Sequence, residues 1–222
     1  MEKRKIVFGT YDTAAAGWTL TGWKLAAPVQ KTKYLDKVGG DGSYDLSTAL
    51  TDGVMRYDDR QLTASFECSE GDRMARESTI RQMVNQLDGM RLHIQLPDDQ
   101  QYYLVGRVSV RRDYNDMAHA AVTVSAVCEP WKYADLETVR ALTVTAAEQT
   151  AMLVNNGRRA IVPLLTVTGS SASVRLSYGT ASVSLSAGEH KWPDLLLTPG
   201  VHELKYSGSG ALQITYREAV LE

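Results

Sequence analysis

The feature that most constrains the fold is a succession of short alternating or β-branched segments separated by turn residues. In the second half of the chain they recur about every ten residues, a spacing typical of β-sandwiches. The turns between them include Asn156-Gly157, Gly169-Ser170, Pro199-Gly200 and Ser207-Gly208. The expected strands are 140–145, 161–167, 173–176, 181–185, 195–197, 202–206 and 212–216. We therefore expect a mainly β protein whose C-terminal part is a jelly-roll type sandwich.

The distribution of charge divides the 222 residues into two parts. Residues 1–135 carry 17 Lys/Arg and 19 Asp/Glu, whereas residues 136–222 carry 7 of each and are rich in Ser, Thr and Gly. Pro130 lies at the change, and proline cannot donate to a strand ladder. We expect domains at 1–134 and 135–222.

Two alternating segments of the first part end in cysteine. Leu62, Ala64, Phe66 and Cys68 share one face of an expected strand, and positions 122, 124, 126 and 128 repeat the pattern up to Cys128 in a segment expected over 119–128. Two cysteines so far apart suggest neither a disulfide framework nor a local metal site. Both thiols are therefore expected in the core.

One helix and one hairpin are expected between these strands. Apolar residues at 74, 80, 83, 84 and 87 follow helical spacing over 72–88, with Asp72 as the N-cap and Gly89 just beyond the C-terminus. Segments 91–96 and 102–112 alternate around the turn residues 97–100. The first domain should therefore be a β-sandwich or barrel-like unit with one helix.

Overall charge and hydropathy exclude several classes of protein. The net charge of −2 predicts no clustered basic face for holding nucleic acid. The longest apolar runs, such as 14–16 and 118–122, are far shorter than the roughly 18 residues that span a bilayer. The N-terminus lacks the apolar core of a signal peptide. We expect no membrane insertion and no Sec-type secretion.

No arrangement of residues indicates catalysis. His93, His119, His190 and His202 lack the spacing of a metal site or a catalytic triad. The acidic pairs 58–59 and 98–99 could serve general acid/base chemistry, although turns favour Asp for its local hydrogen bonds. We expect no enzyme activity and no cofactor, and a hydrolase with an acidic pair is the alternative.

Two further motifs have competing interpretations. Residues 39–42, Gly-Gly-Asp-Gly, resemble a phosphate loop but lack its Gly-Lys-Ser/Thr ending, so a loop with positive φ is favoured. Trp192, His190 and Tyr206 form a candidate sugar-stacking platform. The alternative for these aromatic residues is packing at the edge of the core or in a protein interface.

The order of these motifs resembles the distal tail protein family of long-tailed phages. The resemblance extends over the whole chain in layout, and it is more specific in the N-terminal part. The matching residues are Gly39-Gly40-Asp41-Gly42, Asp45-Leu46, Tyr57 to Arg60, helix 72–88 with Leu87-Asp88-Gly89, Pro97-Asp98-Asp99, Tyr103, Gly106-Arg107, Cys128 to Lys132, Val154 to Gly157, Pro163 and 200–216.

The resemblance implies a hexameric ring at the virion tail tip, assembled in the host cytoplasm. N-terminal domains would form the ring, and C-terminal galectin-like sandwiches would project from it. The ring would contact the tail tube, tape-measure and tail-tip hub proteins, and DNA would cross its lumen. A carbohydrate-binding protein that holds host-surface sugar is the alternative function. Candidate subunit-interface residues are Gly39, Gly40, Asp41, Gly42, Tyr57 and Arg60.

Overall fold

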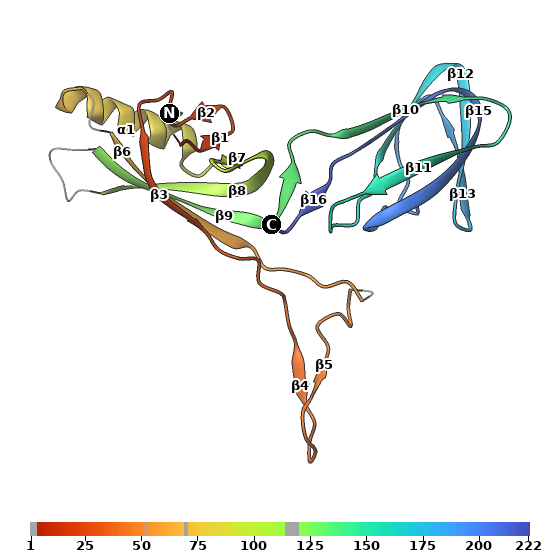
Figure 1. The fold of residues 1–222 in the computed structure, drawn as a ribbon, viewed down its shortest axis with the longest axis horizontal. Helices are drawn as coiled ribbons and strands as arrows, with labels where there is room; N and C mark the ends of the chain where they lie inside the picture. The colour runs from red at the N-terminus through yellow and green to blue at the C-terminus, as the bar shows by residue number, and fades with distance from the viewer. Residues whose placement is uncertain (1–3, 52, 69–70, 114–119) are drawn as a thin grey trace. The chain divides into compact units, whose positions relative to one another are not determined.

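The computed structural model describes residues 4–51, 53–68, 71–113 and 120–222, which fall into two compact units, Met1–Lys132 and Tyr133–Glu222 (Figure 1). The boundary lies two residues before the expected one. Strands dominate both units, and the described residues contain one α-helix, α1. This confirms the mainly β prediction. The predicted start of a strand at His119 lies outside the described residues.

The first unit is built on an antiparallel sheet that includes three strands the sequence did not suggest, namely β1, β2 and β3. The order across the sheet is β2 (Tyr11–Asp12), β1 (Val7–Phe8), β7 (Arg91–Leu96), β8 (Asp99–Asp113), β9 (Ala120–Ala134), β6 (Arg60–Cys68) and β3 (Thr19–Leu25). One face of this sheet is covered by α1 and the N-terminal segment, whose Phe8, Trp18, Met83 and Leu87 are buried.

The central pair of strands, β6 and β9, places both thiols in the core. Leu62 lies opposite Ala126, Phe66 opposite Val122, and Cys68 opposite Ala120. All the residues of the two alternating faces are buried, including Cys68 and Cys128, and both cysteines are free thiols. The predicted inward register is therefore confirmed.

The helix α1 (Arg73–Leu87) forms where its spacing and caps predict it. The Asp72 carboxylate accepts a hydrogen bond from the Ala75 N–H at 2.8 Å, and Gly89 adopts a φ of +74°. These are the stabilising interactions expected at the two ends of a helix. Ile80, Met83 and Leu87 are buried, but the side chain of Met74 is 81% exposed. The assignment of Met74 to the apolar face was wrong because the first turn extends beyond the sheet's core.

The hairpin of β7 and β8 confirms the second local prediction, with a tighter turn. Leu96 lies opposite Asp99, so only Pro97 and Asp98 connect the strands. His93 is exposed and stacks on Tyr103 with ring centroids 4.4 Å apart.

The second unit contains one sheet that curls over its own core through two long strands, β12 (Leu164–Tyr178) and β15 (Gly200–Tyr216). The first half of β12 pairs with the second half of β15, and the remaining halves pair with each other. The edge strands are β10 (Thr138–Val144), β11 (Gln149–Asn155), β13 (Ala181–Ser186) and β14 (Gly188–Lys191). Leu153, Leu165, Val174, Leu204 and Ile214 lie in the enclosed core.

Two predicted turns in this unit are bends inside long strands. Gly169 and Ser171 adopt positive φ within β12, where the pairing register shifts between Thr168 and Ser173. Gly208 and Gly210 occupy the facing part of β15. Residues 164–167 and 173–176, like 202–206 and 212–216, are thus parts of continuous strands, whereas 161–163 precede β12. The expected strand 195–197 retains only an isolated bridge between Ile161 and Leu197.

The C-terminus is tied to the start of the second unit. The Ala134 N–H donates to the Glu218 carbonyl at 2.9 Å, and Arg217 donates to the carbonyls of Ala134 and Asp135. The last short strand, β16 (Ala219–Val220), pairs with β9, whose final two residues belong to this unit.

Candidate functional site

A long segment of the first unit, residues 29–46, takes no part in the hydrophobic core. We call it the exposed arm, because every residue in it is exposed to solvent. It contains β4 (Tyr34–Asp36) and β5 (Ser43–Asp45), which pair only with each other in the described structure. Figure 1 shows them as a separate two-stranded ribbon between β3 and β6. The core of the first unit contains no residue of this segment.

Backbone and side-chain hydrogen bonds define the shape of the arm. The Leu46 N–H donates to the Lys33 carbonyl at 2.8 Å, and the Lys33 N–H donates to the Ser47 hydroxyl at 2.8 Å. Farther along, the Ser43 hydroxyl donates to Asp36 at 2.9 Å. Hydrogen bonds from Ser47 lower the pKa of the Asp45 carboxyl. The two limbs therefore hold each other without contacting a hydrophobic core.

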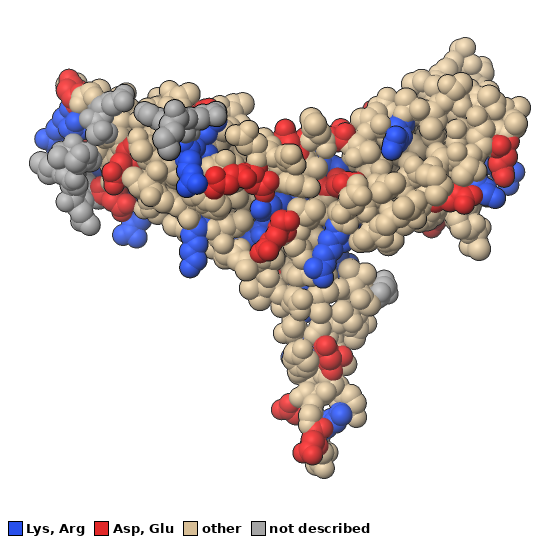
Figure 2. Space-filling model, viewed as in Figure 1, with Lys and Arg blue, Asp and Glu red and all other residues tan. Residues whose placement is uncertain are grey.

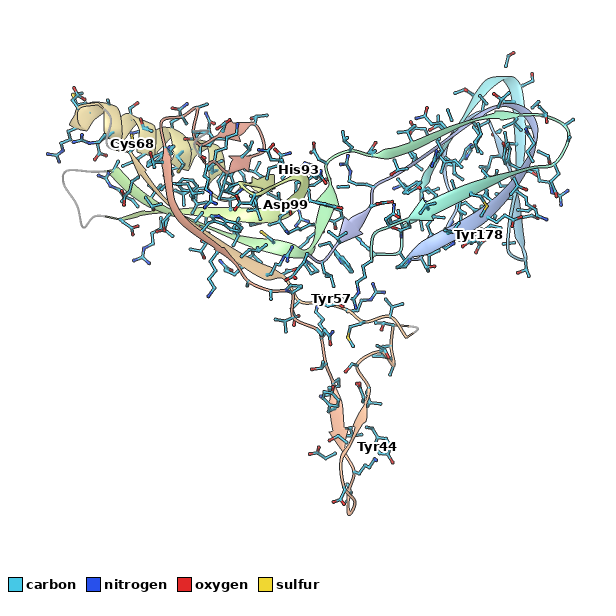
Figure 3. All side chains as sticks on the ribbon, viewed as in Figure 1. Tyr44, Tyr57, Cys68, His93, Asp99 and Tyr178 are labelled. Carbon is cyan, nitrogen blue, oxygen red and sulfur yellow. The ribbon has the colours of Figure 1, made fainter. Side chains whose placement is uncertain are left out.

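Both faces of the hairpin carry large apolar or aromatic side chains. Leu35 lies directly opposite Tyr44, so the two share one face, while Tyr34 lies on the other. These three side chains are 55%, 57% and 58% exposed, and Val38 at the tip is fully exposed. Figure 3 shows Tyr44 on this hairpin. Apolar side chains gathered on such a narrow ribbon are typical of a surface that binds another protein.

The tip of the arm explains the glycines of the motif at 39–42. Gly39 and Gly42 have φ angles of +74° and +77°, a region that residues with a Cβ rarely adopt. The predicted positive φ is thus confirmed at these two positions. Gly40 and Asp41 complete an exposed turn, and the site is the end of a hairpin, not a strand-to-helix loop. This geometry differs from that of a phosphate loop.

The two remaining candidate interface residues lie outside residues 29–46, and Tyr57 forms an isolated antiparallel β-bridge with Gln30 at the base of the arm. Tyr57 is half-buried and contacts Trp131 edge to face, with ring centroids 5.6 Å apart (Figure 3). Arg60 is only 3% exposed and occupies the first position of β6, opposite Cys128. Arg60 is therefore part of the core in a single chain, which argues against a role on an exposed interface.

Sequence reasoning did not single out three exposed apolar or aromatic residues of the arm, Leu35, Val38 and Tyr44. The segments Tyr-Leu-Asp and Ser-Tyr-Asp on either side of a glycine-rich turn carry a hairpin signal. Each strand is only three residues long, which is too short for its alternation to stand out. Charges of both signs lie along the arm, as Figure 2 shows. Because these charged residues are interspersed with the apolar ones, the segment looks polar in the sequence.

The residues considered for catalysis have structural contacts. Asp58 pairs with Lys31 at 3.4 Å and Asp99 with Lys132 at 2.6 Å, while both ring nitrogens of His202 are hydrogen-bonded, to Tyr178 and to the Thr198 carbonyl. His119 lies outside the described residues. Among the residues that are described, no group of three or more His, Cys, Asp or Glu could hold a metal ion.

The candidate sugar platform is largely internal. Trp192 and Tyr206 are each 7% exposed and belong to the core of the second unit, and the Trp192 indole N–H donates to Asp194 at 2.9 Å. His190 is half-buried and hydrogen-bonded to the Ser186 carbonyl. Rings buried in this way cannot stack on a sugar, which argues against this platform.

The helix found in the described residues is not long and apolar enough to cross a membrane.

Comparison with known proteins gives a likeness in structure. No family model matches the sequence, and no curated protein matches it. The crystal structure of SPP1 Dit (gp 19.1), described as a paradigm of the hub adsorption apparatus in phages that infect Gram-positive bacteria, is 14% identical. It matches with a TM-score of 0.68 over 97% of this chain and 98% of that chain.

Two structures of the phage P2 baseplate in its activated conformation also match. The one with Ca is 8% identical, with a TM-score of 0.45 and 98% of each chain covered. The one with Sr is 9% identical, with a TM-score of 0.44 over 96% of this chain and 97% of that chain. Scores this low support no argument. From its first unit through its second, this chain has a fold similar to that of SPP1 Dit.

Proposed function

We propose that this chain is a structural distal tail protein of a long-tailed phage, which forms a hexameric ring at the tail tip. The fold likeness to SPP1 Dit spans both units, and the sequence motifs follow the order of that family. A fold alone does not fix a function. The observation that carries the proposal is therefore the exposed arm, because it supplies a surface for contact between subunits.

The arm would be poorly stabilised in an isolated chain. A two-stranded hairpin without a covering layer is at best marginally stable in water. This one also keeps Leu35, Val38 and Tyr44 exposed, although burying side chains of this size typically stabilises by about 1.5–3 kcal/mol each. A contact between the arm of one copy and a different surface of the next is heterologous, and such contacts form a ring when the rotation between neighbouring copies closes.

The remaining parts of the proposal follow from the resemblance. The ring would join the tail tube and the tape-measure protein to the tail-tip hub, and DNA would pass through its lumen as transient cargo. A net charge of −2 suits a conduit that does not retain DNA, since tight binding requires a contiguous basic surface. The role is structural, with no catalytic step and no cofactor. The protein would be located in the virion tail tip, after assembly in the host cytoplasm.

The experiment is to measure the mass of the purified chain by size-exclusion chromatography with light scattering, over a range of concentrations. We expect a species of six times the 24.4 kDa chain, visible as rings by electron microscopy. The ring is also tested in the presence of the tail tube and hub proteins, because assembly can require a neighbouring ring as a template. A chain that stays monomeric in both settings contradicts the proposal.

A second measurement tests the conduit. Duplex DNA titrated into the assembled protein at physiological salt should bind weakly or not at all. Submicromolar binding that weakens steeply with salt would indicate a surface built to hold DNA, and it would contradict the proposed passage through the lumen.

A further inference from the structure

One outer face of the second unit carries an array of serine side chains. Three neighbouring strands, β15, β12 and β13, align their outward residues in three rows. From β15 through β12 to β13, the paired residues of the three rows are Ser209, Ser173 and Ser186, then Ser207, Arg175 and Ser184, then Lys205, Ser177 and Ser182. We call these nine residues the serine grid. Adjacent strands lie about 4.8 Å apart, so the grid is a regular array of hydroxyl groups.

The hydroxyls of the grid are available to a ligand. Ser177 and Ser207 are half-exposed, and the other seven residues of the grid are exposed. Of the seven grid serines, all of which are described, only Ser209 engages its hydroxyl with the protein, as an acceptor from the Ser173 N–H at 3.4 Å. Each hydroxyl can both donate and accept a hydrogen bond.

The charges of the grid are all positive. Arg175 occupies the central position, where its eight neighbours are seven serines and Lys205. Glu148 pairs with Lys205 from outside the grid at 3.8 Å, with the two side chains 65% and 50% exposed, and Glu203 follows at the margin. An exposed ion pair of this kind contributes little. The Arg175 guanidinium has no acidic residue among its eight neighbours in the grid, so it can bind an anionic group of a ligand.

The opposite outer face of the same unit provides a natural contrast. There the aligned residues of β10, β15, β12 and β14 are Val139, Thr215, Leu164 and Lys191, then Ala141, Gln213, Thr166 and Glu189. This face mixes three aliphatic side chains with two threonines, one glutamine, one cation and one anion. Serine and positive charge together are thus particular to the grid, and they are not a general property of the sandwich surface.

We propose that the serine grid binds an anionic, hydroxyl-rich polysaccharide, with Arg175 holding an acidic group and the serines bonding to neighbouring hydroxyls. Arginine binds planar oxyanions through two parallel hydrogen bonds, which fixes the ligand's orientation. This binding site does not depend on ring formation. It is separate from the buried Trp192 and Tyr206.

Two other ligand classes fit less well. A neutral sugar is commonly held by an aromatic ring that packs against its apolar face, and the grid contains no aromatic residue. Nucleic acid requires many phosphate contacts for tight binding, and single strands add base stacking on aromatic side chains. Two cations and seven hydroxyls instead match a polymer with sparse negative charge and many hydroxyl groups.

The test uses the full chain and three probes, namely lightly substituted dextran sulfate, which keeps most of its hydroxyl groups, uncharged dextran of equal length, and duplex DNA, with binding measured by calorimetry at physiological salt. We expect binding of dextran sulfate and none of uncharged dextran. Arg175→Gln should weaken binding about tenfold, the size expected for one charge-assisted pair. The double variant Ser173→Ala/Ser184→Ala should weaken it several-fold at unchanged charge.

Lys191→Gln is the matched control, because it removes one exposed cation from the opposite outer face of the same unit. It should bind dextran sulfate like the wild type. Thermal melting of each variant verifies folding, and Arg175→Lys provides a second variant that keeps the charge but loses the paired donors. The proposal is overturned by no binding, by equal losses for Lys191→Gln and Arg175→Gln, by an unaffected serine double variant, or by DNA binding as tight as that of dextran sulfate.

Discussion

The sheet of the first unit and its arm use similar residue patterns with opposite results. In β6 and β9, alternate residues such as Phe66 and Val124 are almost fully buried, because α1 and the N-terminal segment cover that face. In β4 and β5, Leu35 and Tyr44 also lie on one face, yet each is more than half exposed. Alternation defines which residues share a face, but only a covering layer decides whether that face is buried.

This difference separates the energy of folding from the energy of assembly. The sheet residues stabilise the isolated chain, since their apolar surface leaves water on folding. The exposed arm residues contribute little to the stability of the isolated chain, and under the proposed function a second copy would cover them in the ring. Substitutions in the two regions should therefore affect different measurements, which the following experiments exploit.

Phe66→Ala should have the largest effect on the stability of the chain. Phe66 is 1% exposed and packs edge to face on Phe8, with ring centroids 6.4 Å apart. Truncation of such a residue costs about 3–5 kcal/mol, in part because of the cavity left behind. Denaturant unfolding measures the loss. A cost below about 1 kcal/mol would show that β6 is not central to the core.

Alkaline pH should destabilise the chain through Cys128. Burial raises the pKa of its thiol from 9.0 to about 11. Between these values the unfolded thiol ionises while the folded one stays protonated. The contribution of Cys128 to the free energy of unfolding is therefore complete below pH 9 and is lost as the pH rises to about 11. Comparing the unfolding of the wild type and Cys128→Ala at pH 8 and pH 10.5 isolates this contribution. An equal pH dependence in both proteins would contradict this origin.

Burial of both thiols also predicts slow reaction with a thiol reagent. Cys68 and Cys128 are 4% and 0% exposed, so a reagent in solution cannot reach either sulfur in the folded chain. Labelling should be slow in the native protein and fast in denaturant. Rapid native labelling of either cysteine would show that the inward register of β6 or β9 is wrong.

Asp72→Ala should have an intermediate effect. The substitution removes the acceptor for the Ala75 N–H at the start of α1 and should cost about 1 kcal/mol. Asp72→Asn retains an acceptor and is the matched control, with a much smaller cost. Thermal unfolding distinguishes the two variants. Equal losses would mean that charge, not the hydrogen bond, stabilises the helix.

Leu35→Ser and Tyr44→Ser should have the smallest effects on the unfolding of the isolated chain. Both side chains are already exposed, and surface substitutions usually change stability by less than about 0.5 kcal/mol. Comparison with Phe66→Ala under the same conditions gives the contrast directly. A cost above about 2 kcal/mol would mean that the arm packs on its own chain.

Local signals in the sequence were sufficient to predict several elements of the fold. The spacing of Ile80, Met83 and Leu87, with Asp72 and Gly89 at the ends, predicted α1, and alternation predicted the buried cysteines. These signals succeed because the residues concerned face a nearby core. By contrast, β3 has weak alternation and includes Gly22, so its pairing with β6 depends on a partner that is remote in sequence.

The arm and the grid could not be predicted for different physical reasons. Glycine at 169 and 208 indicates a turn in sequence, whereas both positions here bend continuous strands that pair with each other. The serine grid depends on that long-range register, since its rows combine residues up to 36 positions apart, such as Ser173 and Ser209. In the arm, the apolar residues have no periodic run long enough to stand out.

The most direct test of the central claim is to compare the mass of the wild type with that of the double variant Leu35→Asp/Tyr44→Asp by light scattering, together with the unfolding of each. We predict rings for the wild type and monomers for the variant, which retains the stability of the isolated chain. The account is contradicted if the folded variant assembles as well as the wild type, because the exposed arm would then not be the surface that joins the subunits.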